Sequence, residues 1–158
     1  MQPHLPAQIA VHFQQVYHGG NWASSHYKAV MADIDWTMAN QTMGGCNSIA
    51  SLFFHTQYYI GIVLKVLQGG QLQGSDKESF VHPPVHNEAE WEAYKTQAWQ
   101  QAEAFAAALA NLPESQLWQD FIKPAYHTYY WQMHGLIEHL HYHLGQIVVL
   151  KKILRHQA

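Results

Sequence analysis

The stretch EHLHYHLGQIVVLKKILR, residues 138–155, carries histidine at positions 139, 141 and 143. On a strand all three imidazoles would share one face, whereas on an α-helix His139 and His143 lie about 40° apart and His141 points to the opposite side. Lysine and arginine crowd the end of the stretch, where cations suit the helix dipole. Apolar residues recur at helical spacing within and just before it, namely Leu136, Leu140, Ile147, Leu150 and Leu154. The pattern therefore predicts an α-helix whose buried face includes His139 and His143.

Two imidazoles on a buried helix face need partners, because burying an unpaired polar group costs free energy. Neutral imidazole is the commonest metal ligand in proteins. A histidine pair spaced i, i+4 can place two ring nitrogens on one ion at about 2.0–2.1 Å. The spacing alone also allows a second interpretation, in which both histidines are hydrogen-bonded core residues without a metal.

The composition suits a single domain spanning residues 1–158, with a formal net charge of −3 and only 12% charged residues. This balance provides no basic surface for nucleic acid, and no apolar run is long enough to predict a membrane-spanning helix. The N-terminal MQPHLPAQIAVHF lacks the pattern of a signal peptide, and the single cysteine, Cys46, excludes an internal disulfide. We therefore expect a cytoplasmic protein that binds neither nucleic acid nor membrane.

Four amphipathic segments predict an all-α protein with the architecture of a four-helix bundle. Glycine pairs at 19–20 and 69–70 are expected to end the first two helices. Asn47 or Ser48 is suited to cap the second helix, and Asn87 is suited to cap the third. The four expected helices cover residues 6–17, 48–68, 88–112 and 129–155.

Two connections between these helices stand out. One short extra helix is expected between the first and second long helices, from Ser25 to Met31 or beyond. The polar segment 69–87 is long for a bundle loop, and long loops often border a functional site. No exposed apolar stripe is expected, so the pattern does not favour a helical module that binds a partner protein.

A further histidine, His55, lies on the second long helix in line with its apolar residues Leu52, Tyr59, Ile62 and Val66. Helical bundles build metal sites from side chains that project inward from facing helices. His55 from one helix, with His139 and His143 from another, therefore forms a predicted three-histidine metal site.

Three segments of the chain share a pattern with one known family. In IEHLHYHLGQIVVLKK, residues 137–152, an H-x-x-x-H pair is followed by x-G-Q-I. NSIASLFFHTQYYIGIVLKVLQGG, residues 47–70, contains a single histidine within a helix, and YHGGNWASSHYKAVMADID, residues 17–35, follows the first helix. Together these segments resemble the DinB/YfiT-like superfamily of metalloenzymes, and the resemblance extends over nearly the whole chain.

This resemblance implies a four-helix bundle, often dimeric, that holds a divalent metal ion through three histidines. Carried onto this chain, the ligands are His55, His139 and His143. The resemblance implies nickel or zinc as the ion, and iron is a further possibility. The chain departs from the family at His141, where an acidic or other polar residue is common, and helical geometry turns this side chain away from the ion.

Three neutral imidazoles leave a coordination position open, as in catalytic rather than structural metal sites. An ion held in this way lowers the pKa of bound water and binds thiols as thiolates. The resemblance implies a thiol S-transferase, with a low-molecular-weight thiol as cosubstrate and a small molecule as substrate. Two alternatives stay open: a metal-dependent hydrolase, and a non-catalytic, stress-associated metal-binding protein whose ion joins two helices.

Aromatic residues near the predicted site suit a pocket for an apolar substrate, and the candidates are Trp22, Tyr58, Tyr59 and Tyr142. Gln146 lies one turn after His143 and is a candidate hydrogen-bond partner of that ligand, although it could instead pair with the backbone or a neighbouring helix.

Protonated histidine cannot bind a metal, so we expect metal affinity to fall as the pH drops below the ordinary imidazole pKa of about 6.5.

Overall fold

The computed structural model describes residues 4–157, with residue 157 described by its backbone alone. Every regular element within these residues is a helix, and Asp120 and Thr128 form only an isolated bridge. The all-α prediction is therefore confirmed. The first three residues of the chain, on which part of the signal-peptide expectation depends, lie outside the described residues.

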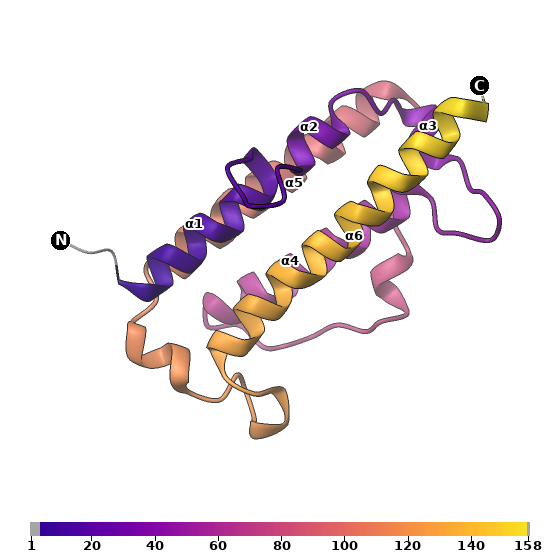
Figure 1. Ribbon diagram of the computed structural model, residues 1–158. Helices are drawn as coiled ribbons and strands as arrows, with labels where there is room; N and C mark the ends of the chain where they lie inside the picture. The colour runs from indigo at the N-terminus through magenta and orange to yellow at the C-terminus, as the bar shows by residue number, and fades with distance from the viewer. Residues whose placement is uncertain (1–3, 158) are drawn as a thin grey trace.

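Four long helices enclose one hydrophobic core: α1 (Leu5–His18), α4 (Ile49–Leu67), α5 (Glu88–Ala110) and α6 (Tyr129–Gln157). α1 and α4 each pack against both α5 and α6, so the four helices form a closed ring. Figure 1 shows the four helices running along a common direction. The largest fully buried side chains in this core include Trp91, Tyr17, Tyr27, Phe13 and Phe53.

The ends of these helices follow the capping chemistry of the sequence. The side chain of Ser48 accepts a hydrogen bond from the backbone nitrogen of Ser51, and that of Asn87 accepts one from Glu90. Gly19 and Gly69 follow α1 and α4 with positive φ angles of 98° and 83°, which only glycine adopts readily. The predicted positions of the four long helices are confirmed to within a few residues.

The connection between α1 and α4 contains two short helices, α2 (Tyr27–Met31) and α3 (Trp36–Asn40), where one was expected. The expectation of a single short helix was therefore wrong. The carboxylate of Asp35 accepts a hydrogen bond from the backbone nitrogen of Met38 and so begins a new helix. Local capping divides a segment whose apolar spacing alone reads as one helix.

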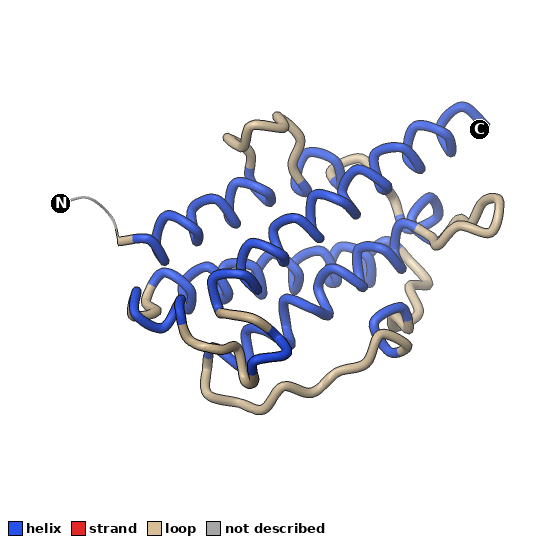
Figure 2. The backbone as a smooth tube through the Cα atoms, turned by 60° about the horizontal axis from the view of Figure 1, so that its bottom comes forward, coloured by secondary structure: helices blue, strands red, loops and turns tan. Residues whose placement is uncertain are grey.

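The long connection from α4 to α5 runs back along α4, because α4 and α5 point in the same direction. The Phe54 ring on α4 stacks with the Tyr94 ring on α5. Later along both helices, the backbone oxygen of Gln57 accepts a hydrogen bond from the side chain of Gln101. Residue numbers therefore increase in the same direction along the two helices. Two parallel neighbouring helices require a crossover, which is the long loop seen in Figure 2. The crossover contains a short 3-10 helix, η1 (Glu78–Phe80), that packs against α4.

The segment between α5 and α6, which the sequence analysis left unassigned, also contains short 3-10 helices. These are η2 (Glu114–Trp118) and η3 (Pro124–Tyr126). η2 packs against both α1 and α6, so it covers one end of the ring of long helices.

α4 is also the one described helix that is long and apolar enough to cross a membrane by length and composition alone. Its most apolar window has a mean hydropathy of 1.2, yet 72% of that window is buried inside the protein. Such burial is typical of a core helix. The expectation that the protein has no membrane partner stays a prediction.

The outer face of α6 carries an exposed apolar stripe, so the expectation that no such stripe exists was wrong. Trp131, Tyr142, Val149 and Ile153 expose between 38% and 64% of their surface. Their spacing along the helix places them within about 40° of one another around its axis. α6 also buries apolar residues against α4 and α1. The sequence therefore shows apolar residues on both its inner and its outer face, and their spacing does not separate the exposed face from the buried one.

Candidate metal centre

Three histidine side chains meet between α4 and α6. The Nε2 atom of His139 lies 2.9 Å from Nε2 of His55 and 3.0 Å from Nε2 of His143. One ring nitrogen from each residue lies within 4.8 Å of the other two, a grouping suited to a metal ion. His55 and His143 are buried and His139 is partly exposed, so the cluster has one side open.

His141 takes no part in this cluster. Its Nδ1 atom lies 3.1 Å from the backbone oxygen of Ile137, and its ring faces His12 on α1 at 6.5 Å. This orientation follows from the helical period, which separates His141 from the face shared by His139 and His143. His82 and His86, in the crossover loop, also lie outside the cluster.

Hydrogen bonds outside the cluster fix the protons on two of the histidines. The Ser79 hydroxyl donates a hydrogen bond to the backbone oxygen of Asp76 at 2.6 Å. Its proton is used in that bond, so the Ser79 oxygen accepts a hydrogen bond from Nδ1–H of His55, 2.8 Å away. The amide oxygen of Gln146 lies 2.7 Å from Nδ1 of His143 and accepts from it. A neutral imidazole has one N–H, so both residues direct an Nε2 lone pair inward.

His139 lacks a partner of this kind, because its Nδ1 atom is buried without a hydrogen-bond partner among the described residues. If the proton of His139 is on Nε2, it faces the inward lone pairs of His55 and His143. If the proton is on Nδ1, the Nε2 lone pairs of all three histidines face one another. A cation satisfies all three nitrogens at once. Ligands at 2.0–2.1 Å on a tetrahedral ion are about 3.3 Å apart. The two Nε2 separations from His139 therefore need to lengthen by only a few tenths of an ångström.

The pKa values of the three histidines keep them neutral at pH 7. Burial and, to a smaller extent, the neighbouring His143 lower the pKa of His55 to about 4. Burial and the two neighbouring histidines lower the pKa of His139 to about 4. Burial also lowers the pKa of His143, although the hydrogen bond that His143 donates to Gln146 acts in the opposite direction. Neutral imidazole is the form that binds a metal.

The crossover loop closes one side of the cluster. The Phe80 ring stacks on His55 with centroids 3.9 Å apart and an angle of 13° between the planes. Ser79 is fully buried beneath it. Sequence reasoning missed Ser79, Phe80 and Asp76 as parts of the site. The only signal was the unusual length of the loop, because a serine in a polar segment does not reveal which histidine it will meet.

A cavity of about 380 Å³ opens beside the cluster, with His55 and His139 in its wall. Its apolar side is formed by Val63, Trp131 and Leu136. Its polar side contains Asp76 and Tyr59, whose hydroxyl donates to the Asp76 carboxylate at 2.5 Å. A small, largely apolar molecule in this cavity would lie against two of the three clustered histidines.

The structure separates the four aromatic pocket candidates. Tyr59 lines the cavity and packs edge-on against His55 and His139. Tyr142 lies outside the cavity, with its ring against His143 and its hydroxyl accepting from Gln146. Tyr58 lines a different cavity, between α4 and α5. Trp22 is fully exposed after α1 and lines neither of these cavities.

No protein-family model matches the chain, and searches among curated proteins and solved structures also found no match. Inference about function therefore depends on the geometry of the histidines and the cavity beside them.

We expect zinc affinity to change little between pH 8 and pH 7 and to fall most steeply as the pH approaches 4. The ordinary imidazole pKa would place the fall below about 6.5, but burial and the neighbouring histidines move the pKa of His55 and His139 to about 4. Protons therefore compete with the metal only at lower pH. Titrations against a chromophoric zinc chelator between pH 4 and 8 measure the affinity.

The same shifts affect the metal-free protein. In the unfolded chain, His55 and His139 bind protons near pH 6.5, whereas in the folded chain they bind protons near pH 4. The free energy of unfolding should therefore decrease as the pH falls through this interval. Denaturant melts in the presence of EDTA measure it. A zinc affinity that already drops about tenfold between pH 7 and 6 would contradict the assigned shifts.

Proposed function

We propose that this protein is a divalent-metal enzyme of the DinB/YfiT-like type that transfers a thiol to a small electrophilic molecule. In this proposal His55, His139 and His143 hold nickel or zinc, and the four long helices form a bundle of the DinB type. The observation that carries the proposal is the convergence of imidazole lone pairs beside an open cavity. A closed structural site would have a fourth protein ligand instead of a cavity.

The protein groups have separable roles in this proposal. A bound divalent ion supplies Lewis acidity, which favours the deprotonated form of a thiol or a water molecule. Ser79 and Gln146 orient His55 and His143 and keep their lone pairs directed inward. Phe80 excludes water from one face of His55. The apolar wall formed by Val63, Trp131 and Leu136 would orient an apolar electrophile.

The proposed reaction forms one carbon–sulfur bond. The thiol loses its proton, its sulfur attacks the electrophilic carbon, and the leaving group departs as an anion. No protein side chain is required as the nucleophile. The apolar lining of the cavity favours this reaction over hydrolysis of a polar ester or phosphate, and a metal-dependent hydrolase is the second candidate function.

The test begins with elemental analysis of purified protein, followed by reconstitution with nickel, zinc or iron. Each form is then assayed with cysteine or glutathione and an aryl chloride, and separately with aryl esters in the absence of thiol. We expect thiol-dependent release of chloride that is lost in His139→Ala and retained in His141→Ala. Ester cleavage without thiol would instead favour the hydrolase.

A non-catalytic role predicts a different result. If the ion only joins α4 to α6, removing it should lower the melting temperature sharply, and no thiol or ester should react. An enzyme with a preformed bundle should stay folded after chelation and lose its turnover. Thermal melts with and without EDTA, run beside the assays, separate these two functions.

We further propose that the protein is a cytoplasmic homodimer that pairs through the outer face of α6. The exposed stripe there combines Trp131, Tyr142, Val149 and Ile153 in one direction. Gly145 lies between them, and no atom lies within 4 Å of the position its Cβ would take, so a second helix can approach closely. An exposed apolar surface of this kind is typical of a protein interface.

Replacing Val149 with glutamate should convert the dimer to a monomer, because it places an unpaired charge in an apolar interface. Val11→Glu is the matched control, since Val11 on α1 is 52% exposed and Val149 is 55% exposed. Light scattering coupled to size-exclusion chromatography measures the mass. A monomeric native protein, or equal dissociation by both variants, would contradict pairing through α6.

A further inference from the structure

A further cavity, of about 270 Å³, adjoins the cavity that His55 and His139 line. We call it the outer cavity and the cavity beside the histidines the inner cavity. Four residues line both of them, namely Tyr59, Val63, Asp76 and Gln132. Because the two cavities share this wall, they meet along the surface of α4. Together they form one groove that begins at the histidines.

The wall that belongs to the outer cavity alone is mostly apolar. Ile62 from α4, Leu72 from the crossover loop and Phe121 from the segment before α6 line it, as does Tyr126. Asp76 is the one acidic side chain that lines either cavity, and no described lysine or arginine lines them. The groove therefore suits an uncharged apolar chain better than an anion.

The segment between α5 and α6 is held in a strained conformation beside the outer cavity. Ile122 has a φ angle of 67°, which a β-branched residue rarely adopts, and its side chain is 51% exposed. The preceding Phe121 is only 2% exposed, and its backbone nitrogen donates to the backbone oxygen of His127 at 2.7 Å. Strain of this kind persists only where surrounding contacts hold it, and it is common at ligand sites. Here it accompanies the placement of Phe121 in the wall of the groove.

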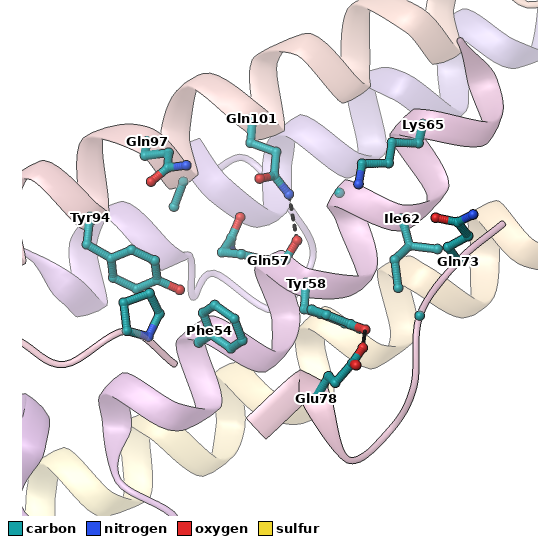
Figure 3. A pocket seen from close by; sticks show the side chains of 14 residues that line it. Phe54, Gln57, Tyr58, Ile62, Lys65, Gln73, Glu78, Tyr94, Gln97 and Gln101 are labelled. Carbon is teal, nitrogen blue, oxygen red and sulfur yellow. Dashed lines mark hydrogen bonds between the residues drawn. The ribbon is translucent and has the colours of Figure 1, made fainter. Parts of the chain in front are cut away.

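The crossover loop separates the groove from the cavity of about 680 Å³ between α4 and α5. Ile62 and Gly74 lie at this boundary, since both residues line the two cavities. A Cβ atom at position 74 would collide with Ile62, so the loop backbone lies directly against this side chain. Figure 3 shows Ile62 extending from α4 toward the crossover loop. This contact gives the groove a closed side.

We propose that the groove binds an electrophile with a long, unbranched, uncharged apolar tail. The inference rests on the proposed thiol transfer for the reacting end of the molecule. The reactive carbon lies in the inner cavity, where it gains a bond to sulfur and the leaving group departs with the bonding electron pair. The tail takes no part in the reaction and extends along α4 into the outer cavity. From His55 to Ile62 the helix advances about 10 Å, the span of an extended chain of about eight carbons.

Titration of the intact, metal-free protein with unreactive 1-alkanols, from butanol to decanol, tests the proposal by NMR of labelled leucine methyl groups. Each methylene buried in the groove should strengthen binding about two- to fourfold, and the gain should stop near octanol, when the groove is filled. Leu136 lines only the inner cavity and Leu72 only the outer one. We expect butanol to shift the methyl signals of Leu136 alone, and octanol to shift those of both residues.

Two variants assign the tail to the outer cavity. Leu72→Trp should fill it, which weakens octanol binding at least about tenfold and leaves butanol binding unchanged. Leu67→Trp is the matched control, because it makes the same change at a half-buried position on α4 that lines neither cavity, and it should alter neither affinity. Thermal melts check folding. Tyr126→Ala, at a position that is 37% exposed, removes part of the wall instead and should weaken octanol binding about fivefold.

Three results would overturn the proposal. These are octanol binding no tighter than butanol binding, octanol that leaves the Leu72 signals unshifted, and equal weakening of octanol binding by Leu72→Trp and Leu67→Trp. Unreactive alcohols and metal-free protein keep this test independent of the proposed thiol transfer. With the zinc form and cysteine, kcat/KM should be at least about tenfold higher for 1-bromooctane than for 1-bromobutane. Chain-length-dependent binding without turnover of either bromide would retain the tail site and refute the thiol transfer.

Discussion

Zinc binding is expected to disappear in His55→Ala and in His143→Ala and to remain intact in His141→Ala. Each of the first two changes removes one of three converging nitrogens and leaves too few ligands to hold the ion. His141 lies on the same helix and is the same residue type, but its ring faces His12 on α1. His141→Ala is therefore a matched control, because it makes the same histidine-to-alanine change on the same helix.

Equilibrium dialysis against zinc, followed by elemental analysis, gives the number of ions per chain for each variant. We expect one ion in the native protein and in His141→Ala, and none in the other two. Thermal melts in EDTA check folding, and the metal-free melting temperatures should stay close to the native value. Equal loss of zinc in all three variants would contradict the helical geometry of the site.

Zinc affinity is expected to fall by about 10- to 100-fold in Ser79→Ala, a residue that does not touch the ion. The Ser79 oxygen accepts from Nδ1 of His55 and so keeps the lone pair on Nε2 directed into the cluster. Without this acceptor the imidazole is free to rotate and to change tautomer. Because Ser79 also donates to the backbone of Asp76, the variant loosens the crossover loop over the site.

Competition with a chelator of known affinity measures this loss, and Ser115→Ala is the control. Ser115 lies exposed on η2 and contributes to neither the histidine cluster nor the cavity beside it. The Ser79 variant should still bind one ion per chain, which separates its effect from that of His55→Ala. An unchanged zinc affinity in a folded Ser79→Ala protein would show that the hydroxyl does not orient the ligand.

The sequence predicted the helical face of each candidate metal ligand correctly because that face depends on local periodicity. Leu140 and Ile147 are buried on α6, and they share the periodic pattern that placed His139 and His143 inward. The same reasoning turned His141 outward. Local chemistry was also sufficient for helix ends, as at Ser48 and Asn87, whose side chains accept the expected capping bonds.

Prediction from sequence was weaker wherever distant segments meet. The crossover loop brings Ser79 to His55 across 24 residues of chain, and no local pattern in a polar loop indicates such a contact. Tyr58 and Tyr59 are adjacent in sequence and alike in character, yet they line different cavities. The exposed stripe on α6 was missed because periodicity shows which residues share a face but not which faces gain a partner.

By itself, the sequence determined the helical class of this protein, the register of its histidines on two long helices and most of the helix ends. These properties depend on interactions within about four residues, namely backbone hydrogen bonds, side-chain caps and the 3.6-residue period. The tertiary structure alone decided that three ring nitrogens converge, that burial lowers the histidine pKa values and that a loop serine orients His55. Those properties depend on desolvation and on contacts between α4, α6 and the crossover loop, which exist only after the chain has packed.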